Sequence, residues 1–592
     1  MRGFLLQVLS IVLASALAVA SSAALAELTS QRIGVVGGVH ASSTGQNLTF
    51  RSGWFGTYID TLNPFTTYSE LSGWINFNTL LPLVHYNDQT TAVTPALAST
   101  WTVNYANHTV IFHLDPNAVW SDGVPVTSQD VVYSYNIAAQ NYSFIEPDVA
   151  AVQNVTALSS SVVQITFTGS LWLWFAAIVF IVPAHVYGKI DPSTYPGYNS
   201  TGSQYFVGDG PYVITQYVVN QYATLQKNPR FFIPSMEPTL TTLIFTEFSS
   251  ESSATSALQA RQIDGLSGIL PAAVSAFQNN SNFIVTTSPG IEYFYLAINV
   301  DPSGHGNPTL KDVAVRQALA HAVNLPYITQ TVFHGYAEQL NTVLMPNDAY
   351  FDANISGYAY NPSLANQMLT AAGYNYGAGG VRVSSNGTAL SYTVLVPSGD
   401  ALEIDAAQIM AQNLSAVGIK LTVQAEDTGT MASTIWPNMN QDMDLWDWFE
   451  TSLMVPDLLS VFLSNQVATG TSDSGFHNAT YDALWAQLLN ASSTSQVTTI
   501  ANQMQTILHE QLPYLPLFVP SVINVYTNSF TGFNPLYPGG PFGGANWMTF
   551  INAQPSTAPA PPNYALYVAI GVVAVIVVAV AVVILSRRRK KE

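Results

Sequence analysis

The densest group of acidic and aromatic side chains in the chain lies in residues 442–451. Indole faces stack on the C–H faces of pyranose rings and carboxylates accept hydroxyl protons, so this segment has the chemistry to hold a sugar. Alternate residues of a strand share a face, so Trp446 and Trp448 would point to the same side. The ligand-binding residues that we expect here are Trp446, Asp447, Trp448 and Glu450.

The first half of the chain contains a second aromatic group that could form the opposing wall of such a site. Its members are Trp54, Phe55 and Tyr58. Large aromatic side chains also dominate ordinary cores, so a purely structural role for each tryptophan stays open.

Catalytic patterns are absent from the sequence. There is no His-Glu-x-x-His, no Gly-x-Ser-x-Gly and no glycine-rich phosphate loop, and the chain has no cysteine. Asp442 and Asp444 could be the acid and base of a glycosidase, although a solvated strand face explains the same spacing. We therefore expect a protein that is not an enzyme, with no catalytic residue, metal or cofactor.

The composition is unusual in its charge. Charged residues make up 9% of the 592 residues, the formal net charge is −19, and apolar residues make up 48%. Nucleic-acid binding needs a basic surface, so a nucleic-acid partner is excluded. A surface with few cations and many neutral polar groups suits an acidic habitat, although composition drift would produce the same pattern. The length predicts two or three packed lobes.

Both ends of the chain carry targeting patterns. Residues 1–26 combine Arg2, an apolar stretch and Ala24-Leu25-Ala26, which is typical of a cleaved signal peptide. Residues 564–585 are uncharged and long enough to span a bilayer as a helix, and a basic tail (586–592) follows them. The sequence thus predicts a large external domain with one C-terminal transmembrane helix and a short cytoplasmic tail.

The segment before that apolar stretch is rich in Pro and Ala. Residues 553–563 should form a short, stiff tether that joins neither helix nor sheet. Several Asn-x-Ser/Thr sequons precede it, which predicts glycosylation of the exported part. They include Asn47, Asn107, Asn154, Asn386 and Asn478.

The external part reads as a mixture of strands and helices. Alternation predicts strands over 109–114 and 162–168, and a helix should begin near Ser128. Apolar residues at helical spacing predict helices over 312–323, 362–372 and 403–417. The last two end at Gly373 and Gly418, and a strand-like stretch follows Gly418, so α/β units are expected.

Several blocks of the sequence resemble the family 5 extracellular solute-binding proteins, the peptide- and nickel-binding type that serves ABC importers. They follow one another in the family's order from about residue 45 to about residue 550. The blocks are Asn63–Phe65, Pro95–Trp101, Val119–Ser134, Gly208–Tyr212, Ser256–Gly265, Val315–Asn324, Asn361–Tyr374, Leu414–Val423 and Tyr514–Phe518. In the best-matching block, Val119–Ser134, caps and a turn explain every polar residue, so its role should be structural.

The resemblance implies an α/β fold of the two-lobed, periplasmic-binding-protein-like type II class, with the ligand cleft between the lobes. Lobe I would comprise 45–290 plus 515–552 and lobe II would comprise 291–514, with hinge strands near 293–300 and 512–518. It also implies ABC permease and ATPase subunits as partners and capture of solute by lobe closure. The predicted anchor and the resemblance together indicate an archaeal, membrane-anchored member.

The resemblance further implies a carboxylate, shortly after a Trp, that pairs with the amino terminus of a peptide ligand. Aligning on Trp448 puts Glu450 near that place with one residue too many, and aligning on Trp446 puts Asp447 too early. Oligopeptide is therefore only slightly favoured over oligosaccharide. A surface-layer or adhesion glycoprotein and an anchored hydrolase remain the alternatives.

Overall fold

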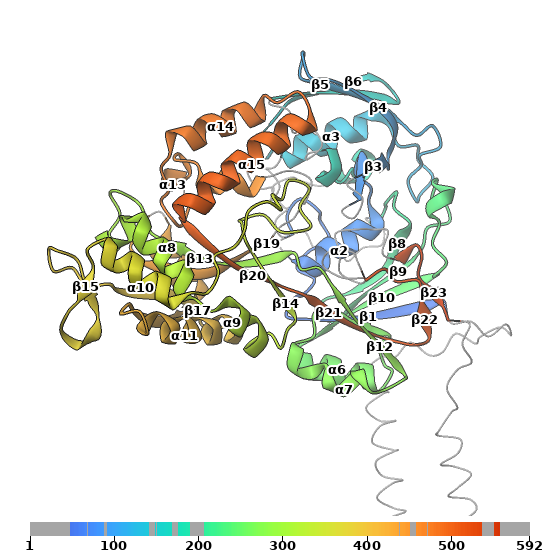
Figure 1. The fold of residues 1–592 in the computed structure, drawn as a ribbon. Coiled ribbons are helices and arrows are strands. Elements are labelled where there is room, and N and C mark those ends of the chain that lie inside the picture. The colour runs from blue at the N-terminus through green and yellow to red at the C-terminus, as the bar shows by residue number, and fades with distance from the viewer. Residues whose placement is uncertain are drawn as a thin grey trace, which may run out of the picture. The chain divides into compact units, whose positions relative to one another are not determined.

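The computed structural model describes most of residues 48–556 (Figure 1). Contacts separate residues 1–47 from the body that begins at Leu48, and the description here concerns that body. The described residues are 48–67, 69–87, 92–140, 149, 151–168, 176–189, 206–436, 438–449, 457–469, 472–535 and 550–556. The predicted signal peptide, transmembrane helix and basic tail lie outside these residues.

A seven-stranded sheet forms the first layer of the body. Its strands, in spatial order, are β12 (Phe283–Ser288), β21 (Val522–Thr527), β11 (Gly265–Leu266), β1 (Thr49–Phe55), β10 (Thr242–Phe248), β9 (Tyr222–Lys227) and β8 (Tyr212–Val218). Helix α6 (Glu251–Gln259) packs on β1 and β11, α7 (Ser275–Gln278) packs on β12, and α2 (Glu70–Thr79) packs on β8. In Figure 1, α6 and α7 lie on one side of this sheet and α2 on the other.

A six-stranded sheet forms the centre of the second half. Its strands, in spatial order, are β14 (Ala337–Gln339), β20 (Tyr514–Pro520), β13 (Glu292–Ile298), β19 (Met443–Phe449), β17 (Ser391–Pro397) and β18 (Lys420–Glu426). Because side chains alternate along a strand, β13 supplies two different cores. Phe294 and Leu296 pack with α8 (Val313–Ala322), α10 (Pro362–Ala371) and α11 (Ala401–Ser415). Tyr293 and Tyr295 pack with α14 (Ala479–Leu489) and α15 (Thr494–Gln511).

A four-stranded antiparallel sheet completes the main architecture. Its order is β4 (Ala98–Asn104), β5 (Thr109–Leu114), β7 (Val162–Phe167) and β6 (Val152–Ser159), and α3 (Ser128–Ala138) packs on β6 and β7. The shorter elements are β2 (Val84–Asn87), β3 (Ala92–Pro95), β15 (Asn375–Tyr376), β16 (Arg382–Val383), α5 (Ala184–Tyr187), α9 (Leu325–Thr331), α12 (Thr428–Ile435) and α13 (Gln466–Thr469). The expected α/β fold is confirmed.

Local sequence signals account for the helix ends in the second half. The side chains of Asp312, Asn361 and Asp400 accept backbone N–H bonds at the starts of α8, α10 and α11. Gly373 and Gly418 follow α10 and α11 with φ of 89° and 80°, a left-handed conformation that glycine adopts without strain. The helices predicted over 312–323, 362–372 and 403–417 are confirmed, with ends shifted by one or two residues.

The block Val119–Ser134 has the structural role that its composition predicts. Trp120 is fully buried. The Asp130 carboxylate accepts from the Thr127 N–H at 2.7 Å and from the Ala184 N–H at 2.9 Å, which ties the start of α3 to α5. Asp122 accepts from the N–H of Val124 at 3.0 Å inside the turn. Asp122 and Asp130 thus serve a turn and a cap, whereas the Ser121 hydroxyl accepts from the Gly208 N–H and the buried Trp120 indole N–H has no partner among the described residues.

The chain passes between the two large sheets twice. It leaves the seven-stranded sheet after Ser288 and enters the six-stranded sheet at Glu292, and it returns between Pro520 and Val522. The two passages touch, because a Cβ at Gly290 would lie 2.1 Å from the carbonyl oxygen of Pro520. The chain therefore crosses back from the six-stranded to the seven-stranded sheet near residue 521.

The start of the predicted tether differs from the expectation. Gln554 and Pro555 form β23, which pairs with β22 (Phe530–Thr531). Pro lacks an N–H but can lie in a short edge strand. The prediction that residues 553–563 join no sheet is therefore wrong for these two residues.

Candidate ligand cleft

Strand β19 places the predicted tryptophans on one face of the six-stranded sheet. Trp446 lies opposite Tyr295 and Trp448 opposite Tyr293 in the register with β13. Both indoles are half-buried. The Trp448 ring lies parallel to that of Tyr295 at 6.4 Å, and its Nε1 donates to the Tyr514 hydroxyl at 3.3 Å. The structure brings these two side chains to a common face, as their spacing predicts.

A buried carboxylate organises the tyrosines behind Trp448. Asp473 is fully buried and accepts hydrogen bonds from the hydroxyls of Tyr295 (2.8 Å) and Tyr514. The two tyrosine rings stack at 4.2 Å. Desolvation raises the pKa of Asp473 to about 6, although both tyrosine hydrogen bonds oppose that rise. With its partners satisfied, Asp473 supports the site from behind.

Five carboxylates form a second group, which we call the acidic group. They come from the start of α2, the start of β13, the start of α11 and the middle of β19. The members are Glu70, Glu292, Asp400, Glu403 and Asp447. Asp447 lies opposite Phe294 in the β13–β19 register, so it projects from the face opposite to Trp446 and Trp448.

The pKa values show how closely these acids are gathered. Desolvation, followed by the charges of Asp447, Glu70 and Asp400, raises the pKa of Glu292 to about 7. Desolvation and the charge of Asp400 raise the pKa of Asp447 to about 6. Like charges disfavour one another's ionised forms at short range, so the five acids share one electrostatic environment. Glu70 acts on Glu292, so the start of α2 lies near the start of β13.

Glu403 is the most confined member of the acidic group. It is 1% exposed, and neither of its carboxylate oxygens has a hydrogen-bond partner among the described residues. Desolvation, then the charges of Asp400, Asp447 and Glu292, raise the pKa of Glu403 to about 10. Glu403 is therefore protonated at neutral pH when no ligand is present.

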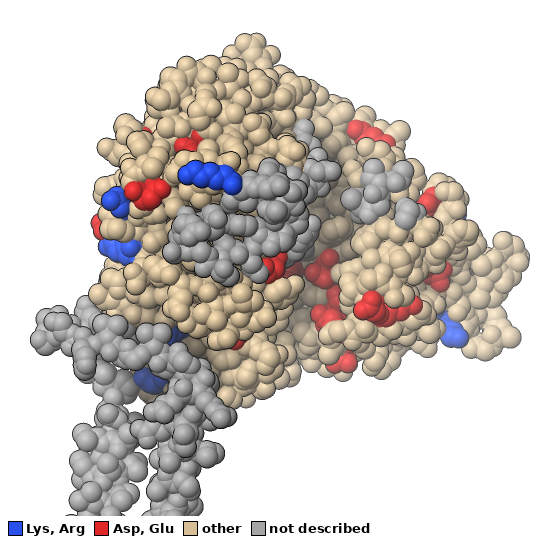
Figure 2. Space-filling view, turned by 180° about the vertical axis from the view of Figure 1, so that it is seen from behind, with Lys and Arg blue, Asp and Glu red and all other residues tan. Residues whose placement is uncertain are grey.

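The acidic group opens to solvent on the side of α2. Glu70 and Glu292 are exposed, yet desolvation by surrounding protein raises the pKa of both. Solvent access combined with close protein atoms is typical of a concave surface. Figure 2 shows Asp and Glu along the hollow that crosses one face of the molecule, and no Lys or Arg among the described residues visible in it. The Trp74 indole N–H donates to Glu70 at 3.1 Å and holds it at this opening.

The expected aromatic wall in the first half is not formed. Trp54 is 5% exposed and packs on Trp74 and Phe245 in the core, with ring centroids at 6.3 and 6.5 Å. Phe55 packs into a different core cluster, and Tyr58 is 59% exposed. Neighbouring residues of a strand face opposite sides, so Trp54 and Phe55 cannot share a wall. The buried Trp54 and Phe55 therefore do not form the expected wall together, and the role of the exposed Tyr58 stays a prediction.

Glu450, the fourth residue expected on β19, lies outside the described residues. The sequence reasoning missed four members of the acidic group: Glu70, Glu292, Asp400 and Glu403. Asp400 and Glu403 have the N-cap and N3 spacing of a capping box, so a search for helix starts would have found that pair. No local pattern distinguishes the other two.

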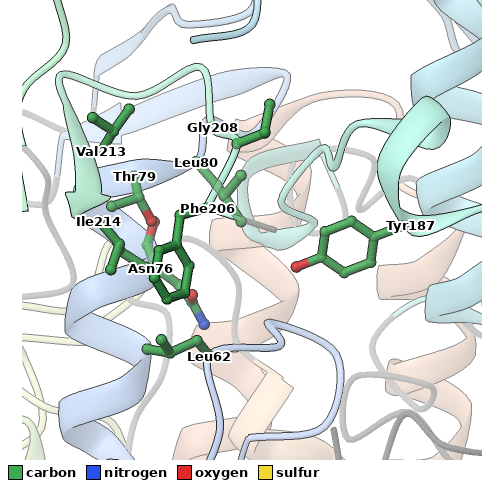
Figure 3. Close-up of a pocket in the computed structure, with 10 residues that line it drawn as sticks. Leu62, Asn76, Thr79, Leu80, Tyr187, Phe206, Gly208, Val213 and Ile214 are labelled. Atoms are coloured by element: carbon green, nitrogen blue, oxygen red, sulfur yellow. The ribbon is translucent and has the colours of Figure 1, made fainter. Parts of the chain in front are cut away.

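A small cavity lies in the first half of the chain (Figure 3). It has a volume of about 20 Å³, and Asn76, Tyr187 and Phe206 are among the residues that line it. The Asn76 amide nitrogen is buried and has no partner among the described residues. A polar cavity of this size suits one bound water and excludes a nutrient-sized solute.

Residues 92–470 match the family described as bacterial extracellular solute-binding proteins, family 5 middle. A Brucella ovis protein named as an ABC transporter peptide-binding protein is 27% identical over 359 residues, or 60% of this chain and 64% of that protein. The glutathione-binding protein GsiB of Escherichia coli is 24% identical over 365 residues, or 61% of this chain and 68% of GsiB. The chain thus spans less than two thirds of the Brucella relative.

Solved structures share the fold at low sequence identity. An oligopeptide ABC transporter periplasmic oligopeptide-binding protein of Thermotoga maritima gives a TM-score of 0.73 at 18% identity, covering 87% of this chain and all (100%) of that one. NikA of Brucella suis, in complex with Fe(III)-EDTA, gives 0.73 at 21% identity, with 86% and 100% coverage. AppA of Bacillus subtilis, in complex with a nonapeptide, gives 0.68 at 20% identity, with 86% and 99% coverage. These matches confirm the α/β fold of type II periplasmic binding proteins.

Proposed function

Because the chain belongs to the family 5 extracellular solute-binding proteins, we propose that it is the substrate-binding receptor of an ABC importer and that it captures oligopeptides. The observation that carries the choice of ligand is the acidic group. Its carboxylates come from α2 as well as from β13, β19 and α11, and none of them forms an ion pair within the described part of the chain. A peptide ammonium group would relieve their repulsion, whereas a neutral oligosaccharide would not.

Closure of two lobes would enclose the ligand. The proposed lobe I holds the seven-stranded sheet and lobe II the six-stranded sheet, which is close to the division into 45–290 plus 515–552 and 291–514 except that the return moves to residue 521. The hinge would be the paired passages at 289–291 and Ser521, because only these two connect the large sheets among the described residues. Paired, short connections are the usual sites of hinge bending.

The proposed ligand-binding residues are those of the acidic group together with Trp446 and Trp448. Asp447 belongs both to the acidic group and to the ligand-binding residues that the sequence predicts. Glu450 remains a proposed member on its sequence position alone. Both indoles are half-buried on the face of β19 opposite to Asp447, so a ligand would have to extend past the end of the strand for the tryptophan faces to pack against its side chains.

The proposed location is the outer surface of the cell membrane, with permease and ATPase subunits as partners. Export by the signal peptide of residues 1–26 and anchoring by 564–585 rest on their sequence patterns, as do glycosylation and an archaeal origin. No helix within the described residues has the length and hydropathy needed to cross a membrane. Cleavage mapping and membrane extraction of the expressed full-length protein would test the two ends.

Calorimetric titration of the full-length protein in detergent tests the ligand class. The probes are tri- to pentapeptides, the same peptides with acetylated amino termini, and neutral oligosaccharides. We expect the free peptides to bind without turnover and acetylation to weaken binding by at least about tenfold, since it removes a charge-assisted hydrogen bond. Binding of oligosaccharides but not peptides would overturn the ligand, and hydrolysis of either would overturn the receptor function.

A further inference from the structure

Glu403 has a position that ordinarily serves helix capping, yet it makes no cap. It occupies N3 of α11, from which a glutamate usually reaches back to the N-cap N–H. The N-cap residue is Asp400, whose N–H instead donates to the Pro397 carbonyl at 3.2 Å. The Glu403 carboxylate is left buried and unpartnered. A buried polar group without a hydrogen-bond partner destabilises the folded protein. We therefore expect a ligand, absent from the free protein, to supply the hydrogen bond that Glu403 lacks.

The groups that face Glu403 are all acidic. They are Asp400 on its own helix, Asp447 on β19 and Glu292 on β13, with Glu70 of α2 acting on Glu292. Asp444 projects from the other face of β19 and interacts with Glu403 through its charge. The cations of the adjoining elements are directed elsewhere: Arg316 on α8 donates to the carbonyls of Leu310 and Gln511, and Lys420 on β18 is exposed. The three ion pairs among the described residues do not involve the acidic group. The site therefore lacks positive charge.

The shape of the site favours an organic cation over a metal ion. Among the described residues, no three His, Asp or Glu side chains converge closely enough to hold a metal. The acids are instead spread over four elements, from Glu70 at the opening to the enclosed Glu403. One ammonium group at the opening relieves the repulsion of the acids beside it but stabilises the enclosed Glu403 less, since Coulomb attraction falls with distance, so a second cation is needed at Glu403.

We propose that the cleft selects a ligand with two cationic groups close together, a peptide with a free amino terminus and Lys or Arg at its first position, and that Glu403 accepts the cationic side chain. This inference rests on the proposed receptor function and names its substrate class. As the side chain enters, the Glu403 O–H bond breaks, the proton leaves to solvent, and the carboxylate accepts an N–H from the ligand. Ligand binding thus exchanges a proton for a cation.

The test compares peptides on the full-length protein in detergent at pH 7. The probes are Lys-Ala-Ala and its neutral near-isostere norleucine-Ala-Ala, titrated in buffers of different ionisation enthalpy. We expect the Lys peptide to bind at least about tenfold more tightly, as one charge-assisted hydrogen bond provides. We also expect it to release about one more proton than the norleucine peptide, because Glu403 is protonated in the free protein at this pH.

Two variants assign the effect to Glu403. In Glu403→Gln the ratio of the affinities for Lys-Ala-Ala and norleucine-Ala-Ala should fall to about one, and the additional proton release should disappear. Asp405→Asn, an exposed acid on the same helix, should keep both. Equal affinity for the two peptides in the wild type overturns the inference and leaves the peptide receptor standing. Binding of neither peptide overturns the proposed function itself.

Discussion

The buried carboxyl of Glu403 makes a quantitative prediction about stability. Its pKa of about 10 in the folded protein compares with 4.5 for an ordinary glutamate. A folded-state pKa above the unfolded value contributes stability that is complete below pH 4.5 and is lost as the pH rises towards 10. At pH 7 the lost stability depends only on the difference between the pH and the unfolded-state pKa of 4.5, because Glu403 still holds its proton in the folded state.

The magnitude follows from that distance. About 2.5 pH units at about 1.4 kcal/mol each give roughly 3 kcal/mol of lost stability at pH 7. The variant Glu403→Gln has a neutral side chain of similar shape in both states and does not incur this loss. We therefore expect it to match the wild type at pH 4 and to exceed it by about 3 kcal/mol at pH 7.

Urea unfolding followed by tryptophan fluorescence, from pH 4 to pH 8, measures this difference. The other members of the acidic group contribute equally to both proteins, because protonated Glu403 and glutamine are both neutral to their neighbours. Asp405→Asn on the same helix should leave the pH dependence of stability unchanged. A wild type and Glu403→Gln variant that differ by a constant amount at every pH would refute the burial and protonation of Glu403.

Three further predictions concern other described residues. Asp473→Asn leaves one of two buried tyrosine hydroxyls, Tyr295 or Tyr514, without an acceptor and should lower the free energy of unfolding by about 2 kcal/mol, read by urea titration; an unchanged stability would contradict the network. Gly290→Ala places a Cβ 2.1 Å from the Pro520 carbonyl oxygen and should lower the melting temperature. It should also reduce the ligand-induced compaction that small-angle scattering measures. Compaction equal to that of the wild type would show that this contact has no role in the hinge. The wild type should be more stable at pH 5 than at pH 8, since the folded-state pKa values of Glu292 and Glu403 are about 7 and 10; calorimetric scans that show the opposite order would contradict the sign.

Helix ends were predictable from sequence because their causes are local. The caps at Asp312 and Asn361 and the stops at Gly373 and Gly418 lie within a few residues of the turns that they determine. Sheet order was not predictable in this way. It places β13 between β20 and β19, and each of these two strands lies more than a hundred residues beyond β13 in the chain. The short pairing of Gln554 and Pro555 with β22 has the same non-local origin.

The site was predictable only where a single strand determines it. The alternation of β19 correctly put Trp446 and Trp448 together, and the same rule, applied to β1, would have separated Trp54 from Phe55. The acidic group depends on sheet order and on how α11 packs against β17 and β18. Glu292 and Glu403 therefore lie near one another because of non-local packing, which no short stretch of the sequence reveals.

The composition and the site explain each other. The chain has 16 Lys and Arg against 35 Asp and Glu, so few internal cations are available to neutralise a cluster of acids. In the free protein the acids reduce their mutual repulsion by retaining protons, which makes the folded state less stable as the pH rises. A cationic ligand replaces those protons, so its binding free energy includes relief of a repulsion that already exists in the empty cleft. Each proton displaced should weaken binding by about tenfold per unit of pH below the pKa of the group that loses it. Because the pKa of Glu403 is about 10, binding of a cationic ligand should tighten as the pH rises, until the ligand's own amino terminus begins to lose its proton at about pH 8.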